Sequence, residues 1–224
     1  MDNSDCIYKG VCEEECPSVC VQWVEMKYML NHSNIPKKQQ CIHRLKPDDC
    51  DVPAFEKLSD IQMNIEQFTN DGGVLYIYSN TCGNGKTTWT IKMLLQYFNE
   101  VWEGNGLNIR GLFINVPQFL NKSKAVISKP DPEFEELRNN LETADLVVFD
   151  DVSALANMSG YDYTTLYSYI DSRSFQNMAM IFTGNHSPSE LQKILGDRIA
   201  SRITQGTNIE LKGRDMRQWS SSNS

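Results

Sequence analysis

Apolar and polar positions along the chain follow two patterns. Short apolar runs, rich in β-branched and aromatic residues, predict strands at residues 75–79, 111–116, 145–151, 178–183 and 209–211. Elsewhere, apolar residues recur every three or four positions, which predicts helices at residues 21–30, 54–68, 89–102, 117–124, 133–142, 161–175, 191–195 and 197–203. Strands that alternate with helices predict an α/β fold with a mainly parallel sheet, whose ligands bind at the carboxyl ends of the strands.

The loop after the first predicted strand is short, polar and rich in glycine. It enters a helix through Gly85-Lys86-Thr87, and strand, glycine-rich loop and helix form the layout of a phosphate-binding loop. Backbone N–H groups and the helix N-terminus would face a polyphosphate, Lys86 would reach its terminal phosphates, and the Thr87 hydroxyl would bind Mg2+. The predicted nucleotide-binding residues are Asn80, Thr81, Cys82, Gly83, Asn84, Gly85, Lys86, Thr87 and Thr88.

One position departs from the usual pattern G-x-x-x-x-G-K-[ST]. Asn80 stands where the first glycine is expected. Asparagine tolerates a positive φ better than other non-glycine residues, so we expect the turn to form. If Asn80 cannot adopt the turn, nucleotide binding would be weak and Asn80→Gly would tighten it. The alternative interpretation is a chance Gly-Lys-Thr in a surface loop.

Two carboxylates directly follow the apolar part of the third predicted strand. Residues 146–149 are apolar, and Asp150 and Asp151 come next. Asp150 would hold Mg2+ through water, opposite Thr87, and Asp151 would polarise the attacking water as a base. An ordinary strand end that leads into a turn is the alternative.

Two later segments end in polar groups that suit the same site. Asn185 follows the fourth predicted strand, where it would orient the attacking water or sense the terminal phosphate; a turn-forming Gly-Asn pair is the alternative. Arg198 and Arg202 lie one helical turn apart on one face. Paired arginines suit stabilisation of phosphate charge, particularly from a neighbouring subunit, with Arg202 favoured over Arg198. A solvated face paired with acids is the alternative.

Six of the seven cysteines lie within the first 50 residues. An odd number without a signal peptide disfavours a disulfide framework and leaves a metal site or buried free thiols. Four thiolates would close a tetrahedral zinc site or hold an iron–sulfur cluster, although the spacing lacks the C-x2-C pair typical of zinc and Pro17 limits a shared helix. The candidate ligands are Cys12, Cys16, Cys20 and Cys41.

Composition sets limits on the class of protein. The chain has 224 residues, 40% of them hydrophobic, which suits one medium domain with a small extra module. No apolar run reaches the roughly 18–20 residues that cross a bilayer, and the acidic start is no secretory signal, so we expect a cytoplasmic protein without a membrane partner. The net charge of −8 argues against a basic coat protein for nucleic acid but leaves room for a local basic channel.

In their order and spacing, these motifs resemble an AAA+ ATPase. The Arg-x-x-Ser-Arg form of residues 198–202, and a core that ends soon after it, are similar to the DnaA/DnaC/IstB branch, above all to DnaC/DnaI-type replicative helicase loaders of the phage-encoded kind. The resemblance covers roughly residues 54–217. It implies a parallel-sheet P-loop core without a full helical lid, preceded by a small, Cys-rich, mostly helical module.

The resemblance also implies roles for the residues of the motifs. ATP and Mg2+ would be bound by Lys86 and Thr87, while Asp150 and Asp151 would order the metal and catalyse hydrolysis. Many AAA+ proteins have glutamate at the second of these acidic positions, so Asp151 is a departure.

In the same family, Asn185 would be the first sensor and Arg202 would act on the ATP of a neighbour in a homo-oligomer. Arg217 would replace the sensor arginine of the missing lid. The family's N-terminal module grips a replicative helicase of the DnaB type, and its ATPase core assembles on single-stranded DNA. We therefore expect a helicase-interaction module, an ATPase core and a disordered tail, at residues 1–53, 54–217 and 218–224.

Contact with DNA is expected near Lys122, Lys124 and Lys129, because lysines beside an aromatic such as Phe119 can bind a backbone and stack a base. A solvated basic loop is the alternative. For the whole chain, the competing functions are a transposition helper similar to IstB, which uses the same core with a transposase, and a small-molecule kinase of the phosphate-loop superfamily. A kinase would need neither a trans-acting arginine nor a Cys-containing module.

Overall fold

The structure is a computed structural model that describes residues 6–8, 20–41, 44–155 and 159–215. Five strands form its sheet: β1 (Val74–Tyr78), β2 (Gly111–Asn115), β3 (Leu146–Asp150), β4 (Ala179–Gly184) and β5 (Thr207–Glu210). The helices of the N-terminal half are α1 (Val21–His32), α2 (Val52–Met63), α3 (Ile65–Asn70) and α4 (Lys86–Val101). Those of the C-terminal half are α5 (Val116–Ser128), α6 (Pro132–Thr143), α7 (Gly160–Phe175), α8 (Pro188–Leu195) and α9 (Asp197–Thr204).

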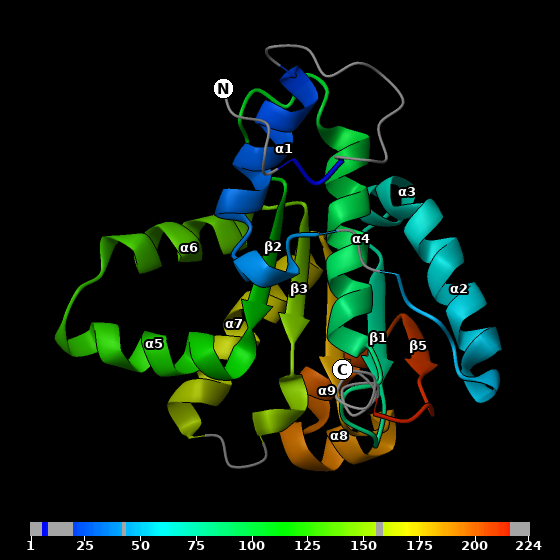
Figure 1. Ribbon diagram of the computed structural model, residues 1–224. Helices are drawn as coiled ribbons and strands as arrows, with labels where there is room; N and C mark the ends of the chain where they lie inside the picture. The colour runs from blue at the N-terminus through cyan, green and yellow to red at the C-terminus, as the bar shows by residue number, and fades with distance from the viewer. Residues whose placement is uncertain (1–5, 9–19, 42–43, 156–158, 216–224) are drawn as a thin grey trace, which may run out of the picture.

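All strand pairs in the sheet are parallel, in the order β2-β3-β4-β1-β5. The predicted α/β fold with a parallel sheet is therefore confirmed. Because the strands run in one direction, their carboxyl ends share one edge, which lies in the lower half of Figure 1 beside the start of α4. The order places β1 between β4 and β5, and the loop after β1 therefore emerges near the middle of that edge.

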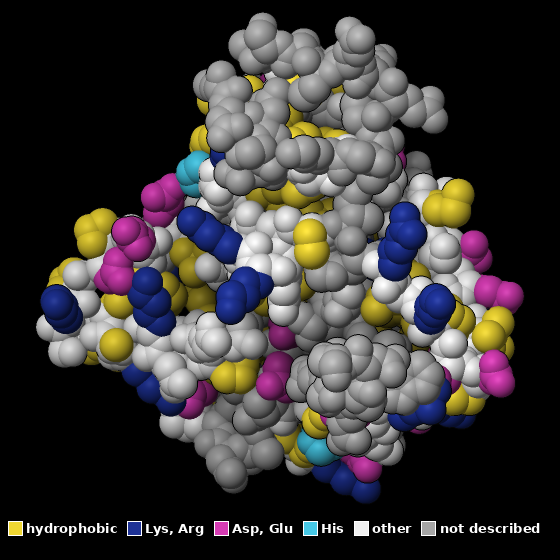
Figure 2. All heavy atoms as spheres, in the orientation of Figure 1, with side chains coloured by type: hydrophobic (Ala, Val, Ile, Leu, Met, Phe, Trp, Pro, Cys, Tyr) yellow, Lys and Arg dark blue, Asp and Glu magenta, His cyan; other side chains and the backbone are white. Residues whose placement is uncertain are grey.

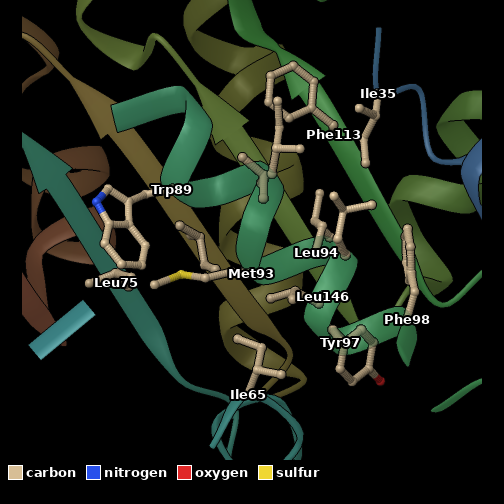
Figure 3. Packing of buried hydrophobic residues seen from close by; sticks show 14 of the residues in the cluster. Ile35, Ile65, Leu75, Trp89, Met93, Leu94, Tyr97, Phe98, Phe113 and Leu146 are labelled. Atoms are coloured by element: carbon tan, nitrogen blue, oxygen red, sulfur yellow. The ribbon is translucent and has the colours of Figure 1, made fainter. Parts of the chain in front are cut away.

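Helices cover both faces of the sheet, and each face has its own core. The first core joins α1, α2 and α4 to alternate strand residues such as Leu75 and Val148. Figure 3 shows this packing, with Met93 and Leu94 of α4 turned toward the sheet. The second core joins helices α5 to α9 to the intervening strand residues, such as Tyr76 and Phe149. Burial on both faces explains why the strands read as continuous apolar runs.

Helix α1 packs into the first core. Its Trp23, Met26, Met29 and Leu30 are buried, and Figure 1 shows the helix beside α4 and β2. This contact explains why residues 21–30 contain more apolar positions than a single narrow stripe along a helix would need. The segment after α1 joins the edge strand, because the N–H of Phe113 donates to the Ser33 carbonyl at 2.7 Å. The division of the chain at residue 53 stays a prediction.

Two predicted elements differ from those observed. The helix expected at residues 54–68 is two helices, α2 and α3, which are interrupted at Asn64. The helix expected at residues 117–124 runs on to Ser128 as α5. Residues 44–53 are polar and rich in aspartate and proline, a composition typical of a linker, but Asp51 is buried there and starts α2. Hydrogen bonds to the far C-terminal segment, described below, hold this part of the chain in place.

Candidate nucleotide-binding site

The carboxyl edge of the sheet surrounds a cavity of about 510 Å3. Its walls come from the loop after β1, the start of α4 and the ends of β2, β3 and β4. The sheet thus brings Lys86, Asp150 and Asn185 to one place, as the spacing predicted. The lining residues are Leu45, Cys82, Gly83, Asn84, Gly85, Lys86, Thr87, Thr88, Asn115, Asp150, Asp151, Thr183, Gly184 and Asn185.

The loop before α4 contains two glycines in the left-handed region of backbone conformation. Gly83 and Gly85 have φ values of +75° and +97°, which side-chain-bearing residues rarely adopt. Lys86 is buried at the helix start, and its Nζ donates to the Thr81 carbonyl at 2.9 Å and to Asn84 Oδ1 at 3.2 Å. These contacts hold the ammonium group against the loop and at the wall of the cavity, where terminal phosphates would lie.

Asn80 does not need the special backbone conformation for which glycine is expected. The described residues with positive φ that are not glycine are Asn34, Leu107, Asp151 and Asn177, so Asn80 is outside this group. Its side chain is exposed and it does not line the cavity. The physical reason to expect weak binding from Asn80 is therefore absent.

Asp150 joins the loop to the neighbouring strands. Its Oδ1 accepts hydrogen bonds from the hydroxyls of Thr87, at 2.8 Å, and Thr183, at 2.7 Å. A hydroxyl of α4 and a carboxylate of β3 thus lie in direct contact at the cavity wall. Hard oxygen ligands in this arrangement fit Mg2+, which would be held by Thr87 and Asp150 and would neutralise phosphate charge.

Asp151 has a backbone conformation that is rare for a residue with a side chain. Its φ is +62°, and its N–H donates to Thr183 Oγ1 at 2.9 Å. Because aspartate tolerates the left-handed region better than most residues, the sharp turn after β3 can be made here. The turn places Asp151 at the cavity wall beside Asp150 rather than on the next position of a strand.

Asn185 is anchored by a residue that the sequence motifs did not indicate. The N–H of Asn185 donates to Ser153 Oγ at 2.6 Å, and Ser153 is buried. Gly184 lets this contact form, since a side chain there would collide with Ser153 Oγ and the Tyr76 hydroxyl. Tyr76 donates to the His186 carbonyl at 2.7 Å, and burial raises its pKa to about 12, so the hydroxyl stays protonated.

Asn115 is a second cavity residue that the sequence motifs did not indicate. It ends β2 directly beside Asp150 in the parallel register and lines the cavity. Its side chain also caps α5 by accepting from the Gln118 N–H at 3.2 Å. A polar residue at the end of the second predicted strand was the available signal, by the same rule that selected Asp150 and Asn185.

The two arginines lie away from this cavity. Among the described residues that line it, neither Arg198 nor Arg202 is present. Both are exposed on α9, and Arg202 pairs with Asp171 of α7, with Nη2 3.1 Å from Oδ1. Their roles at a nucleotide site therefore stay predictions.

The candidate metal ligands of the N-terminal segment are only partly described. Cys12 and Cys16 lie outside the described residues. Cys20 caps α1, accepting from the Trp23 N–H at 3.4 Å, and Cys41 is exposed. Within the part of the chain that the structure describes, no three His, Cys, Asp or Glu side chains form a group that could hold a metal.

Two of the three lysines considered for DNA contact have partners within the fold. Lys122 Nζ lies 3.0 Å from Asp131 Oδ2, and Lys124 Nζ lies 2.7 Å from Asp162 Oδ2. Figure 2 shows side chains of both charges on the projecting α5–α6 region. Both lysines are partly exposed and paired with acids, which is consistent with the alternative of a solvated surface and leaves the DNA contact a prediction.

No helix among the residues described combines the length and the apolar character that crossing a bilayer requires.

Comparisons with known proteins converge on one group. Residues 60–210 match the family described as the bacterial DnaA ATPase domain. The replicative helicase loader DnaC of Escherichia coli K12 is 25% identical over 191 residues, which are 83% of this chain and 72% of that protein.

Solved structures show the same fold. The crystal structure of the DnaC helicase loader superposes with a TM-score of 0.61 and 19% identity, over 75% of this chain and 94% of that one. A replication initiator DnaA bound to AMPPCP and single-stranded DNA gives a TM-score of 0.56 and 18% identity, over 72% of this chain and 46% of that one.

Proposed function

Because the chain belongs to the bacterial DnaA ATPase-domain family, in the DnaA/DnaC branch of AAA+ ATPases, we propose that it binds and hydrolyses ATP to place a replicative helicase on DNA. The helicase is of the DnaB type and the DNA is single-stranded. The observation that best supports ATP hydrolysis is the contact of Thr87 with Asp150. It joins the proposed phosphate-binding loop to an acid at the end of β3.

Each side chain of the cavity has a separate role in the proposed hydrolysis. Lys86 and the loop N–H groups hold the phosphates, and Thr87 with Asp150 holds Mg2+, which supplies positive charge to the terminal phosphate. Asp151 accepts a proton from the attacking water, and Asn185 orients that water. The hydrogen bond from the Asn185 N–H to Ser153 Oγ supports this assignment, since a group that orients water must be held in place.

Arg202 serves the site of a neighbouring subunit. Its exposure on α9, away from its own cavity, supports action in trans, and Arg198 is the second cation of the same face. Its pair with Asp171 is half-exposed and therefore weak enough to be exchanged for a phosphate partner. The ATP-bound form is accordingly a homo-oligomer.

The helicase partner is inferred from the similarity to DnaC, a protein named as a replicative helicase loader. The N-terminal segment is proposed to contact the helicase. Because α1 shares a core with α4, the segment is best tested within the full chain.

The decisive experiment combines the full chain with a purified DnaB-type helicase and single-stranded DNA. We expect co-purification with the helicase and ATP hydrolysis that increases when DNA is added. Stimulation by duplex DNA without helicase binding would instead favour a transposition helper, and phosphate transfer to a small-molecule acceptor would favour a kinase. ATP binding by the wild type and its loss in Lys86→Ala are the controls for the cavity.

A further inference from the structure

The segment that follows β5 lies across the phosphate-binding loop. The N–H of Leu211 donates to the Tyr78 carbonyl at 2.8 Å, just before the loop begins. Within the loop, Asn84 Nδ2 donates to the Leu211 carbonyl at 3.2 Å and to Ser79 Oγ at 2.6 Å. Asn84 is itself buried, so the start of the C-terminal segment and the loop form one packed unit.

Two aspartates before α2 hold the next three residues of this segment. The carboxylate of Asp51 accepts from the N–H groups of Lys212, at 2.7 Å, and Gly213, at 2.8 Å. Asp48 accepts from the Arg214 N–H at 2.9 Å, and Arg214 Nε lies 3.3 Å from its other oxygen. Asp51 is only 1% exposed, so its two bonds form in a site largely shielded from water. We call this arrangement the aspartate clamp.

Gly213 is required by the aspartate clamp. A side chain at this position would approach the carboxylates of Asp51 and Asp48 too closely. Three successive N–H groups therefore bind two carboxylates in a fixed geometry, which is an anion-binding arrangement of the backbone. The residue that follows the clamp in the chain is Asp215.

The clamp places the carboxylate of Asp215 directly against Gly83 of the phosphate-binding loop. A methyl group added to Gly83 would overlap this carboxylate. Gly83 also lines the nucleotide cavity, and its loop is built to attract negative charge from a polyphosphate. A fixed carboxylate beside that loop repels the same polyphosphate.

We propose that Asp215 is a built-in antagonist of nucleotide binding, held against the phosphate-binding loop by Asp48 and Asp51. This inference rests on the proposed binding of ATP at this cavity. Nucleotide binding and docking of residues 211–215 oppose each other, and linkage makes the opposition reciprocal: bound nucleotide weakens docking by the factor by which docking weakens binding. Because the clamp keeps Asp215 nearby, its effective concentration at the loop is high.

The first test measures the Kd of Mg2+–ADP by calorimetry for the full chain and for Asp215→Asn. The expected result is roughly tenfold tighter binding by Asp215→Asn, the size expected for one unit charge a few ångströms from a phosphate in a partly solvated site. Glu142→Gln is the matched control, since it removes one negative charge from the exposed face of α6. Its Kd should equal that of the wild type.

The second test releases the aspartate clamp. Asp51→Asn should also tighten Mg2+–ADP binding, because a loosened segment presents Asp215 to the loop less often. The double variant Asp51→Asn/Asp215→Asn should bind no more tightly than Asp215→Asn alone, since both changes act through one carboxylate. Thermal unfolding of each variant shows whether it is folded at the temperature of the titration.

The outcomes separate this inference from the proposed function. If Mg2+–ADP binds the wild type and Asp215→Asn with equal Kd, or binds the variant more weakly, the antagonism is refuted while ATP binding stands. If none of the folded proteins binds nucleotide, the proposed function fails and the antagonism fails with it. Additive effects of Asp51→Asn and Asp215→Asn would refute the role of the clamp.

Discussion

Each edge of the parallel sheet holds a buried cation, but the two cations have different surroundings. At the amino edge, the guanidinium of Arg173 is 1% exposed and donates to four backbone carbonyls, those of Leu141, Ala144, Asp145 and Ala179. At the carboxyl edge, Lys86 is 9% exposed and lies in the wall of a 510 Å3 cavity. Burial alone therefore does not distinguish the two cations, whereas the adjoining cavity does.

The hydrogen-bonded acids of the two edges show the same contrast. Asp145 accepts from the Tyr97 hydroxyl at 2.9 Å and lies 2.6 Å from Arg110 Nε, and this cluster ties α4 to the start of β3. Asp150 accepts from two threonine hydroxyls at the cavity wall. Asp145 thus has a cationic partner within the fold, whereas Asp150, which accepts from hydroxyls, is the acid proposed to hold Mg2+.

The largest effect is expected at the amino edge of the sheet, where Arg173 is buried. Arg173→Met removes the donors of four buried carbonyls, so the free energy of unfolding should fall by about 3–5 kcal/mol. Burial also lowers the pKa of Arg173, to about 10, because no water solvates its charge there. Urea unfolding measures the loss, and Arg198→Met, on an exposed turn of α9, should change stability by less than about 0.5 kcal/mol. A loss below about 1 kcal/mol for Arg173→Met would contradict the structural role.

At the carboxyl edge of the sheet, the main effect is expected on the binding of nucleotide. Lys86→Ala should weaken Mg2+–ATP binding roughly 100-fold, because a charge-assisted contact to phosphate is lost, and should change stability little. Lys92→Ala is the control, since Lys92 lies further along α4 and its ammonium group sits over the Trp89 ring. Equal weakening by both variants would mean that the site of phosphate binding is wrongly placed.

The anchor of Asn185 should affect catalysis rather than binding. Ser153→Ala removes the acceptor for the Asn185 N–H, and we expect the rate of ATP hydrolysis to fall about tenfold while the Kd stays within about twofold. Ser168→Ala serves as control, because that hydroxyl donates within its own helix, to the Thr165 carbonyl. A weaker Kd with an unchanged rate would show that Ser153 supports the cavity without positioning Asn185.

Local sequence patterns were enough to predict most of the residues at the carboxyl edge of the sheet. Gly85-Lys86-Thr87 and the acids after β3 were read from short apolar runs followed by polar residues, and a parallel sheet brings such strand ends together. The fold class followed from the alternation of strand and helix patterns. These signals lie close in the sequence to the residues that they indicate.

Contacts between distant segments could not be predicted in this way. Ser153 is one hydroxyl in a turn, and only the structure shows that it meets Asn185, 32 residues later. The aspartate clamp joins Asp51 to residues 212 and 213, more than 160 positions away, in a stretch that reads as a polar linker. The packing of α1 could not be predicted either, because an excess of apolar residues in a helix does not show which surface the helix packs against.

The smallest effect is expected at Asn80. Because its backbone does not adopt a left-handed φ, glycine offers no relief of strain, and Asn80→Gly should change the Kd for Mg2+–ATP by less than about threefold. Tightening by Asn80→Gly would be expected only if Asn80 could not adopt the turn. Calorimetric titration of the two proteins decides, and at least tenfold tighter binding by Asn80→Gly would show that the turn is strained.

The central proposal is an ATPase site at the carboxyl edge of the sheet that Arg202 of a neighbouring subunit completes. The most direct test measures ATP hydrolysis in a mixture of Arg202→Ala and Lys86→Ala chains, with single-stranded DNA and a DnaB-type helicase present. Each variant alone should be at least about 100-fold less active than the wild type. The mixture should regain a substantial share of the activity, because Arg202 of a Lys86→Ala chain can serve the intact cavity of its neighbour. A mixture that is no more active than the two variants measured separately would contradict the account.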